Sequence, residues 1–128
     1  MAHKQSRVEA LISDRVMSFE RRLIGRGPDR IHTHLVEDLV VVRSCGVLTV
    51  FERSLLGVPG GAEIVRRSRE ILFDASGKEI ARIVGEATGS AVLHAHSSLS
   101  IERDEWVYVI VLEEPGAGRR EIRHVRQP

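Results

Sequence analysis

The chain has little of several features that mark specialised proteins. Its 128 residues include one cysteine, four prolines and only 4% aromatic residues, and the formal net charge is +1. A single cysteine excludes an internal disulfide framework and fits a reducing compartment. The near-zero charge gives no overall attraction to nucleic acid or anionic lipid, so only a local patch would supply one. At this length one domain with its own core is expected.

Long hydrophobic runs are missing as well. No window of the sequence approaches the ~18 apolar residues that a membrane-spanning helix needs. The segment from Met1 to Ser6 is polar and lacks the apolar centre of a signal peptide. We therefore expect a cytoplasmic protein that is not integral to a membrane.

Familiar catalytic patterns are absent too. The sequence has no paired carboxylates, Ser-His-Asp arrangement, Walker loop or dinucleotide fingerprint. Cys45 follows a run of valines, where a buried and inert thiol is expected rather than a nucleophile. We therefore expect no enzymatic activity, no cofactor and no metal.

What is present is a regular succession of helix and strand patterns. An amphipathic helix is predicted at the N-terminus, with its apolar stripe at three- and four-residue steps: Val8, Leu11, Ile12, Val16, Phe19 and Leu23. Gly25 suits the left-handed position that closes a helix, and Pro28 prevents continuation. The helix should end near Ile24.

Two strands are expected next, over residues 31–35 and 39–44, with Glu37-Asp38 as the turn of a hairpin. The first strand alternates, with Ile31, Thr33 and Leu35 on one face and the two histidines on the other. The second is apolar on both faces. Such a strand is covered on both sides or lies in a subunit contact.

Helices should follow. Thr49 and Glu52 have the spacing of a capping box, which predicts a short helix through Leu56. After a break at residues 57–61, apolar spacing predicts a longer helix from Ala62 to Thr88-Gly89. The apolar residues keep their 3.6-residue spacing on both sides of the weak helix formers at residues 74–78, which favours one continuous, kinked helix over two.

A second pair of strands is predicted over residues 91–99 and 106–112, joined by a polar turn at 102–105. In the last strand Trp106, Tyr108 and Ile110 share one face and three valines the other. Because neither face is polar, we expect either a helix layer on one side with a partner subunit on the other, or a central place in the sheet. Together the two-sided apolar strands predict a homodimer.

The fold class is therefore α+β. Residues 5–114 are expected to form a single domain, with elements in the order α-β-β-α-α-β-β and an antiparallel sheet of about four strands covered mainly on one face. Residues 115–128 form a basic tail with four arginines: Arg119, Arg120, Arg123 and Arg126. A solvated terminus is the simpler interpretation, and a contact with nucleic acid or phospholipid is the alternative.

Two groups of residues are candidates for binding. Gly25-Arg26-Gly27-Pro28 offers amide donors and a guanidinium for a phosphate or carboxylate, although a helix C-terminus repels anions and a structural stop is favoured. His94 and His96 project from one strand face, as do His32 and His34. If these strands were neighbours, four imidazoles would converge on zinc, but solvent-facing histidines are favoured.

Gly57-Val58-Pro59-Gly60 lies between two helices that follow two strands. That order resembles a type II KH domain, in which a Gly-x-x-Gly loop clamps the nucleic-acid backbone. Val58 and Pro59 offer no charge, and proline removes an amide donor, so a plain turn is preferred. A KH-like nucleic-acid-binding module that uses this loop and the arginine tail is the alternative function.

Several short motifs and their order resemble the MpsC-type family, formerly a domain of unknown function. The motifs are the turn at residues 25–28; Val47-Leu48-Thr49 together with Glu52; Arg69 alone; Thr88-Gly89; and the segment from His96 to Leu112. The resemblance covers roughly residues 5–113. It implies a small α+β protein without an established activity, associated with a sodium-translocating system linked to inorganic-carbon uptake. We therefore expect a non-enzymatic accessory or regulatory protein, peripheral to a membrane sodium/bicarbonate transport system.

Overall fold

The structure is a computed structural model that describes residues 2–115. Eight elements follow one another: α1 Ala2–Ile24, β1 Arg30–Val36, β2 Leu39–Cys45, α2 Val50–Leu56, α3 Gly61–Ala75, α4 Gly77–Thr88, β3 Val92–Ser100 and β4 Glu105–Leu112. The predicted α+β class and element order are confirmed, with the long helix divided into α3 and α4. The basic tail predicted from residue 115 lies, beyond Pro115, outside the described residues.

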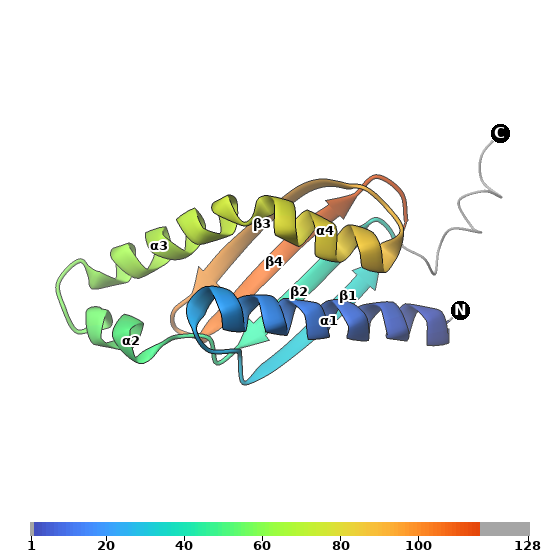
Figure 1. The fold of residues 1–128 in the computed structure, drawn as a ribbon. Helices are drawn as coiled ribbons and strands as arrows, with labels where there is room; N and C mark the ends of the chain where they lie inside the picture. The colour runs from blue at the N-terminus through green and yellow to red at the C-terminus, as the bar shows by residue number, and fades with distance from the viewer. Residues whose placement is uncertain (1, 116–128) are drawn as a thin grey trace.

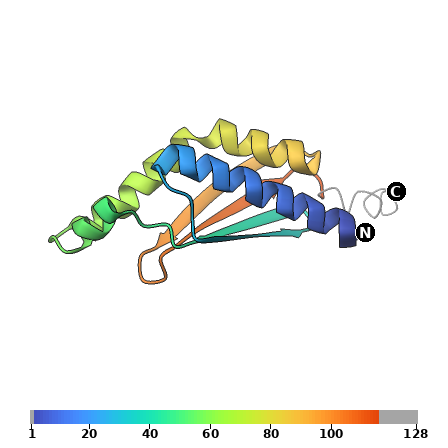
Figure 2. The same ribbon diagram turned by 60° about the horizontal axis from the view of Figure 1, so that its bottom comes forward.

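The four strands form one antiparallel sheet in the order β1-β2-β4-β3. Two hairpins supply it, β1 with β2 and β3 with β4, and they join through β2 and β4 at the centre. Helices α1 and α4 lie across one face of the sheet, and the other face is left open (Figures 1 and 2). This arrangement confirms the prediction of helices mainly on one side.

The core lies between the helices and the covered face. Every second residue of β4 points into it, and Trp106, Tyr108 and Ile110 are completely buried. Phe73 of α3 packs edge-on against Tyr108, with ring centres 4.9 Å apart. The other buried apolar residues of this core come from α1, β1, β2, the β2–α2 loop, α4 and the end of β4: Val8, Ile12, Val16, Phe19, Leu35, Val40, Val42, Val47, Ile80, Ile83, Val84 and Leu112.

The first helix ends where its sequence indicates. Gly25 has φ of 95°, a left-handed conformation that favours glycine, and its amide donates to the carbonyl of Arg21 at 3.0 Å. The predicted end near Ile24 is confirmed.

One expectation about the helices is wrong. The apolar spacing favours one continuous, kinked helix after the break at residues 57–61, but the helix divides at Ser76, which closes α3 and precedes α4. The Ser76 hydroxyl donates to the Leu72 carbonyl at 2.8 Å, and its amide donates to the carbonyls of both Leu72 and Phe73. The serine side chain competes in this way for helix carbonyls, and Gly77 is a poor helix former. The helix therefore breaks here although the apolar spacing continues.

Helix α2 and helix α3 form a hairpin that we call the arm, residues 50–75. Its α2 end and the first turns of α3 extend beyond the end of the sheet (Figure 2). The predicted capping box is confirmed at its base: Thr49 Oγ1 accepts from the Glu52 amide at 3.1 Å, and Glu52 Oε1 accepts from the Thr49 amide at 2.9 Å. The capping box of Thr49 and Glu52 therefore starts the arm, and the arm packs against the rest of the protein only at this end.

Candidate functional site

The turn at residues 25–28 connects α1 to the rest of the chain. Arg26 donates through Nη1 to the Leu48 carbonyl at 3.0 Å and through Nη2 to the Asp29 carboxylate at 2.9 Å. Pro28 is buried. The guanidinium that an anion would use is thus engaged within the chain, which supports the structural interpretation of the turn. Binding at Gly25, Arg26, Gly27 and Pro28 stays a prediction.

The two histidine pairs do not meet. His32 and His34 lie on β1, and His94 and His96 lie on β3, at opposite edges of the sheet with β2 and β4 between them. Three strand spacings separate the pairs by roughly 14 Å. The condition for a four-imidazole site is therefore not met within one chain. Among residues 2–115, no three metal-ligating side chains are grouped together.

His94 and His96 form a pair of their own on the open face. The Nδ1 of His96 and the Nε2 of His94 are 3.1 Å apart, so one donates a hydrogen bond to the other. Both side chains are exposed. In the sheet register they sit opposite Val111 and Val109 of β4, at the edge of an apolar stripe.

That stripe runs along the two central strands on the open face. It consists of Leu39 and Val41 on β2 and Val107, Val109 and Val111 on β4, which the register places side by side. The four valines are half-buried, and Leu39 is exposed. The predicted two-sided apolar strands are confirmed: one side faces the helices, and among the described residues no element covers the other.

A charged pair lies inside the molecule at the base of the arm. Arg69 of α3 is 1% exposed and donates through Nε and Nη2 to the two carboxylate oxygens of Glu52, both at 2.6 Å. The same Nη2 donates to the Val47 carbonyl at 2.7 Å. Nη1 has no oxygen partner, and the guanidinium carbon lies 4.6 Å from the centre of the Trp106 ring. The indole face supplies a cation–π contact in place of an acceptor.

The pKa values of this pair reflect opposing effects. Burial by itself raises the pKa of Glu52, but hydrogen bonds from Arg69 and Thr49 and the charge of Arg69 outweigh it, so the pKa is lowered. Glu52 is thus ionised and Arg69 is held as its counter-ion. Their role is to fix α2 against α3, since Glu52 belongs to one helix and Arg69 to the other.

A second polar group is buried between α1 and the sheet. Glu20 Oε2 accepts from the Tyr108 hydroxyl at 2.6 Å and from the Ser44 hydroxyl at 2.7 Å. Burial raises the pKa of Glu20, and the hydrogen bonds from Tyr108 and Ser44 only partly offset it. Burial, together with the nearby Glu20 charge, also raises the pKa of Tyr108 well above its usual range.

Sequence reasoning did not identify Glu20 and Arg69 as buried residues, although their spacing carried the information. Arg69 lies on the buried stripe of α3 midway between Val65 and Phe73, at steps of four residues. Glu20 follows Val16 by four residues on the buried stripe of α1. A charge on the apolar stripe of a helix indicates a paired buried group, because an unpaired one would be too costly.

Cys45 lies at the end of β2, on the open face. The sequence predicts a buried thiol, but the structure shows Cys45 half-buried. Its Sγ is 3.7 Å from Glu105 Oε2. That carboxylate also accepts from Arg43 Nε at 2.7 Å. The thiol therefore donates to a carboxylate that is already paired with a guanidinium.

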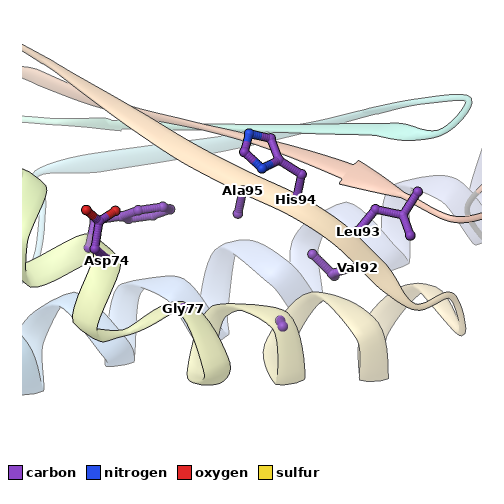
Figure 3. Close-up of a pocket in the computed structure, with 8 residues that line it drawn as sticks. Asp74, Gly77, Val92, Leu93, His94 and Ala95 are labelled. Carbon is purple, nitrogen blue, oxygen red and sulfur yellow. The ribbon is translucent and has the colours of Figure 1, made fainter.

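A hollow of about 260 Å³ lies between β3 and the junction of α3 and α4. Val92 and Ala95 point from β3 toward the helices, whereas the imidazole of His94 turns to the opposite side of the strand (Figure 3). Asp74 and Gly77 border the hollow from the helices. Its walls are mostly small or apolar and contain one carboxylate, so it does not present a set of converging polar groups.

The loop at residues 57–60 is the tip of the arm. Its residues are exposed, and the Gly61 amide that follows donates to the Val58 carbonyl at 2.8 Å, so the segment is a closed turn between helices. This agrees with the plain turn preferred from the sequence. The nucleic-acid alternative stays an untested prediction.

Comparison with known proteins places these features in a family. A family model described as "Na+-translocating membrane potential-generating system (MpsC)" matches residues 4–114. The matched segment includes the turn at 25–28, the arm, the buried pair and the whole sheet. In residues 2–115, no helix has the length and apolar character needed to cross a bilayer.

Two relatives from Bacillus subtilis (strain 168) are similar over most of their length. The uncharacterized protein YrhF is 31% identical over 102 residues, covering 79% of this chain and 84% of its own. The uncharacterized protein YbcI is 27% identical over 112 residues, covering 88% of this chain and 90% of its own. No solved structure matches the chain.

Proposed function

The chain belongs to the MpsC family, and on that premise we propose that it is a non-enzymatic accessory or regulatory protein of a membrane sodium or bicarbonate transport system. The family description carries this proposal, because it names a Na⁺-translocating membrane potential-generating system. The two relatives have uncharacterized names and add no activity to it.

The geometry of the described residues supports a non-enzymatic role. The carboxylate and phenol with the most perturbed environments, Glu20 and Tyr108, are buried and hydrogen-bond to each other. Arg69 and Glu52 are committed to one another at the base of the arm. None of these four groups lines the hollow that Val92 and Ala95 border, although Arg69 borders a smaller hollow of about 100 Å³ beside Ser97 and Glu52 borders the one beside Phe51.

We further propose that the protein works as a homodimer on the cytoplasmic side of the membrane, in peripheral contact with its transport partner. The half-buried valines of the open face and the exposed apolar residues of the arm support self-association, since surfaces of this kind mark interaction sites. The single free thiol fits a reducing compartment.

The test uses membrane vesicles that contain the membrane subunits of the sodium-translocating system. The purified full chain is sedimented with these vesicles and with empty vesicles of the same lipid composition. We expect the chain to pellet only with the vesicles that hold the subunits. Equal sedimentation with both kinds, or with neither, would overturn the accessory function.

A further inference from the structure

The exposed apolar side chains are concentrated on the arm. Val50 is 82% exposed and Phe51 71%, and three more arm residues, Val58, Ile64 and Ile71, are more than half exposed. The other large exposed apolar residues are spread over α1, β1, β2 and β3. A helical hairpin with this composition has an uncovered apolar surface, which marks an interaction site.

Helix α3 carries two apolar stripes, and only one of them faces the body of the protein. Val65, Arg69 and Phe73 are buried. Ile64, Ser68 and Ile71, at steps of four and three residues, form the second stripe. The Ser68 hydroxyl donates to the Val65 carbonyl at 2.9 Å, so it is satisfied within its own helix. A small, satisfied residue between two isoleucines allows another helix to approach closely.

Two shallow hollows flank this stripe, of about 500 and 510 Å³, and Ile64 and Ser68 line both. The first is bounded by the end of α1 and by α2, with Phe51 on its wall. The second runs along α3 as far as Ile71. The surface therefore combines an exposed ring with an apolar groove, and a two-fold contact pairs each such feature with the same patch of the second copy.

The areas favour the arm over the open sheet face as the place where two copies meet. The five exposed arm residues offer on the order of 300–400 Å² of apolar surface at their exposed fractions. A standard interface covers about 800 Å² on each partner, somewhat more than half of it apolar. The valines of the open face are half-buried by their neighbours and offer much less.

We propose that the arm is the dimerisation surface and that its occupant is the arm of a second copy, packed antiparallel along the stripe of Ile64, Ser68 and Ile71. This rests on the homodimer of the proposed function and names its contact. The two-fold axis passes close to Ser68, so that Ile64 of each copy lies against Ile71 of the other. The α2 and α3 helices of both copies then form a four-helix arrangement.

The charges beside the stripe are compatible with this pairing. Glu63, Arg67 and Glu70 alternate in sign along α3, with Arg67 paired to Glu70 at 3.1 Å and Glu63 to Arg66 at 2.9 Å. An antiparallel copy places Arg67, one residue from the axis, near both Arg67 and Glu70 of the second chain. The Glu70 carboxylates of the two copies offset the like charges of the two guanidinium groups at this flank.

Light scattering coupled to size exclusion tests the proposal on the full chain. We expect twice the 14.3 kDa chain mass for the unmodified protein and the single mass for Ile64→Glu and for Phe51→Ser. Leu93→Glu is the matched control, because Leu93 is 63% exposed on β3 and lies off the arm; it should remain dimeric. Circular dichroism spectra and melting curves identify any variant that fails to fold.

Disulfide cross-linking locates the contact without relying on variants that could fail to fold. In a Cys45→Ser background, Ser68→Cys should give a disulfide-linked dimer under mild oxidation, whereas Ser18→Cys, at an exposed position of α1, should not. If Val109→Lys dissociates the dimer while Ile64→Glu leaves it intact, the homodimer stands and the arm proposal is wrong. If the unmodified chain is monomeric at every concentration, both the homodimer and the arm proposal fail.

Discussion

Arg69 and Glu52 meet in a two-point ion pair between α3 and α2, with Nε and Nη2 each 2.6 Å from a carboxylate oxygen. Glu52 also caps α2 by accepting from the Thr49 amide. One carboxylate thus starts a helix and attaches it to the next. The position of the arm relative to the body depends on this contact, because Arg69 in turn binds the Val47 carbonyl and packs on Trp106.

Replacing Arg69 by methionine should lower the free energy of unfolding by about 3–5 kcal/mol, because it leaves the Glu52 carboxylate buried without its counter-ion. Arg69→Lys should also be destabilising, since an ammonium cannot make the side-on, two-point contact. Urea denaturation measures both. The control is Arg15→Ala, which removes an exposed ion pair to Glu86 at 3.6 Å and should cost less than about 1 kcal/mol. Equal losses for Arg69→Met and Arg15→Ala would contradict the assignment.

Glu20 should make the protein less stable as the pH rises. Burial raises its pKa in the folded state, so the folded chain keeps a proton that the unfolded chain has lost. The free energy of unfolding therefore falls from the ordinary glutamate pKa of about 4.3 upward, until the folded group also ionises.

Glu20→Gln removes this titration while it keeps an oxygen for Tyr108 and Ser44. Urea denaturation of both proteins from about pH 4 to about pH 8 should show the variant gaining stability relative to the parent as the pH rises above the ordinary glutamate pKa. Glu52, Glu79 and Glu105 have lowered pKa values and are present in both proteins. Their effects on the free energy of unfolding therefore cancel when the parent and the variant are compared. A difference that stays constant over this range would contradict the raised pKa of Glu20.

Gly61 and Gly77 begin α3 and α4 and should respond differently to alanine. A Cβ at Gly61 would overlap the Leu55 carbonyl oxygen, so the turn between α2 and α3 must shift. A Cβ at Gly77 meets no atom within 4 Å. We expect Gly61→Ala to lower the melting temperature by several degrees, and Gly77→Ala to leave it unchanged or raise it through better helix propensity. Similar melting curves for the two variants would contradict the close approach at Gly61.

Asp104 should anchor the loop that leads into α2. Its Oδ1 accepts from the amides of Val47 and Leu48, both at 2.8 Å, and its Oδ2 accepts from Arg53 at 2.8 Å. Asp104→Ala should cost about 1–3 kcal/mol because it leaves two backbone donors without this acceptor. Asp104→Asn should cost less, since its amide oxygen can accept and asparagine tolerates the φ of 51°. Amide hydrogen exchange at Val47 and Leu48 should rise in the alanine variant and much less in the asparagine variant.

Much of the fold could be predicted because its determinants are local. Gly25 ends α1 through its own φ angle, and Thr49 and Glu52 cap α2 across three residues. The alternation in β4 separated Trp106, Tyr108 and Ile110 from the valines correctly, since neighbouring residues of a strand face opposite ways. The helix break at Ser76 was missed because its hydrogen bonds compete with an apolar phase that continues through it.

The candidate sites depended on contacts that no local pattern contains. Strand order places His34 and His96 at opposite edges of the sheet, so the hypothesis of converging imidazoles is wrong for the single chain. The buried role of Arg69 requires Glu52, 17 residues earlier, and Trp106, which lies on another element.

By itself the sequence determined the elements, their ends, their buried faces and the resemblance to a family, because backbone preferences and apolar periodicity act over a few residues. Only the tertiary structure decided which strands are neighbours, which charges are buried together and which apolar residues stay exposed on the arm. These depend on packing between distant segments, where a side chain such as Ile64 is covered or left open according to the layer that lies above it.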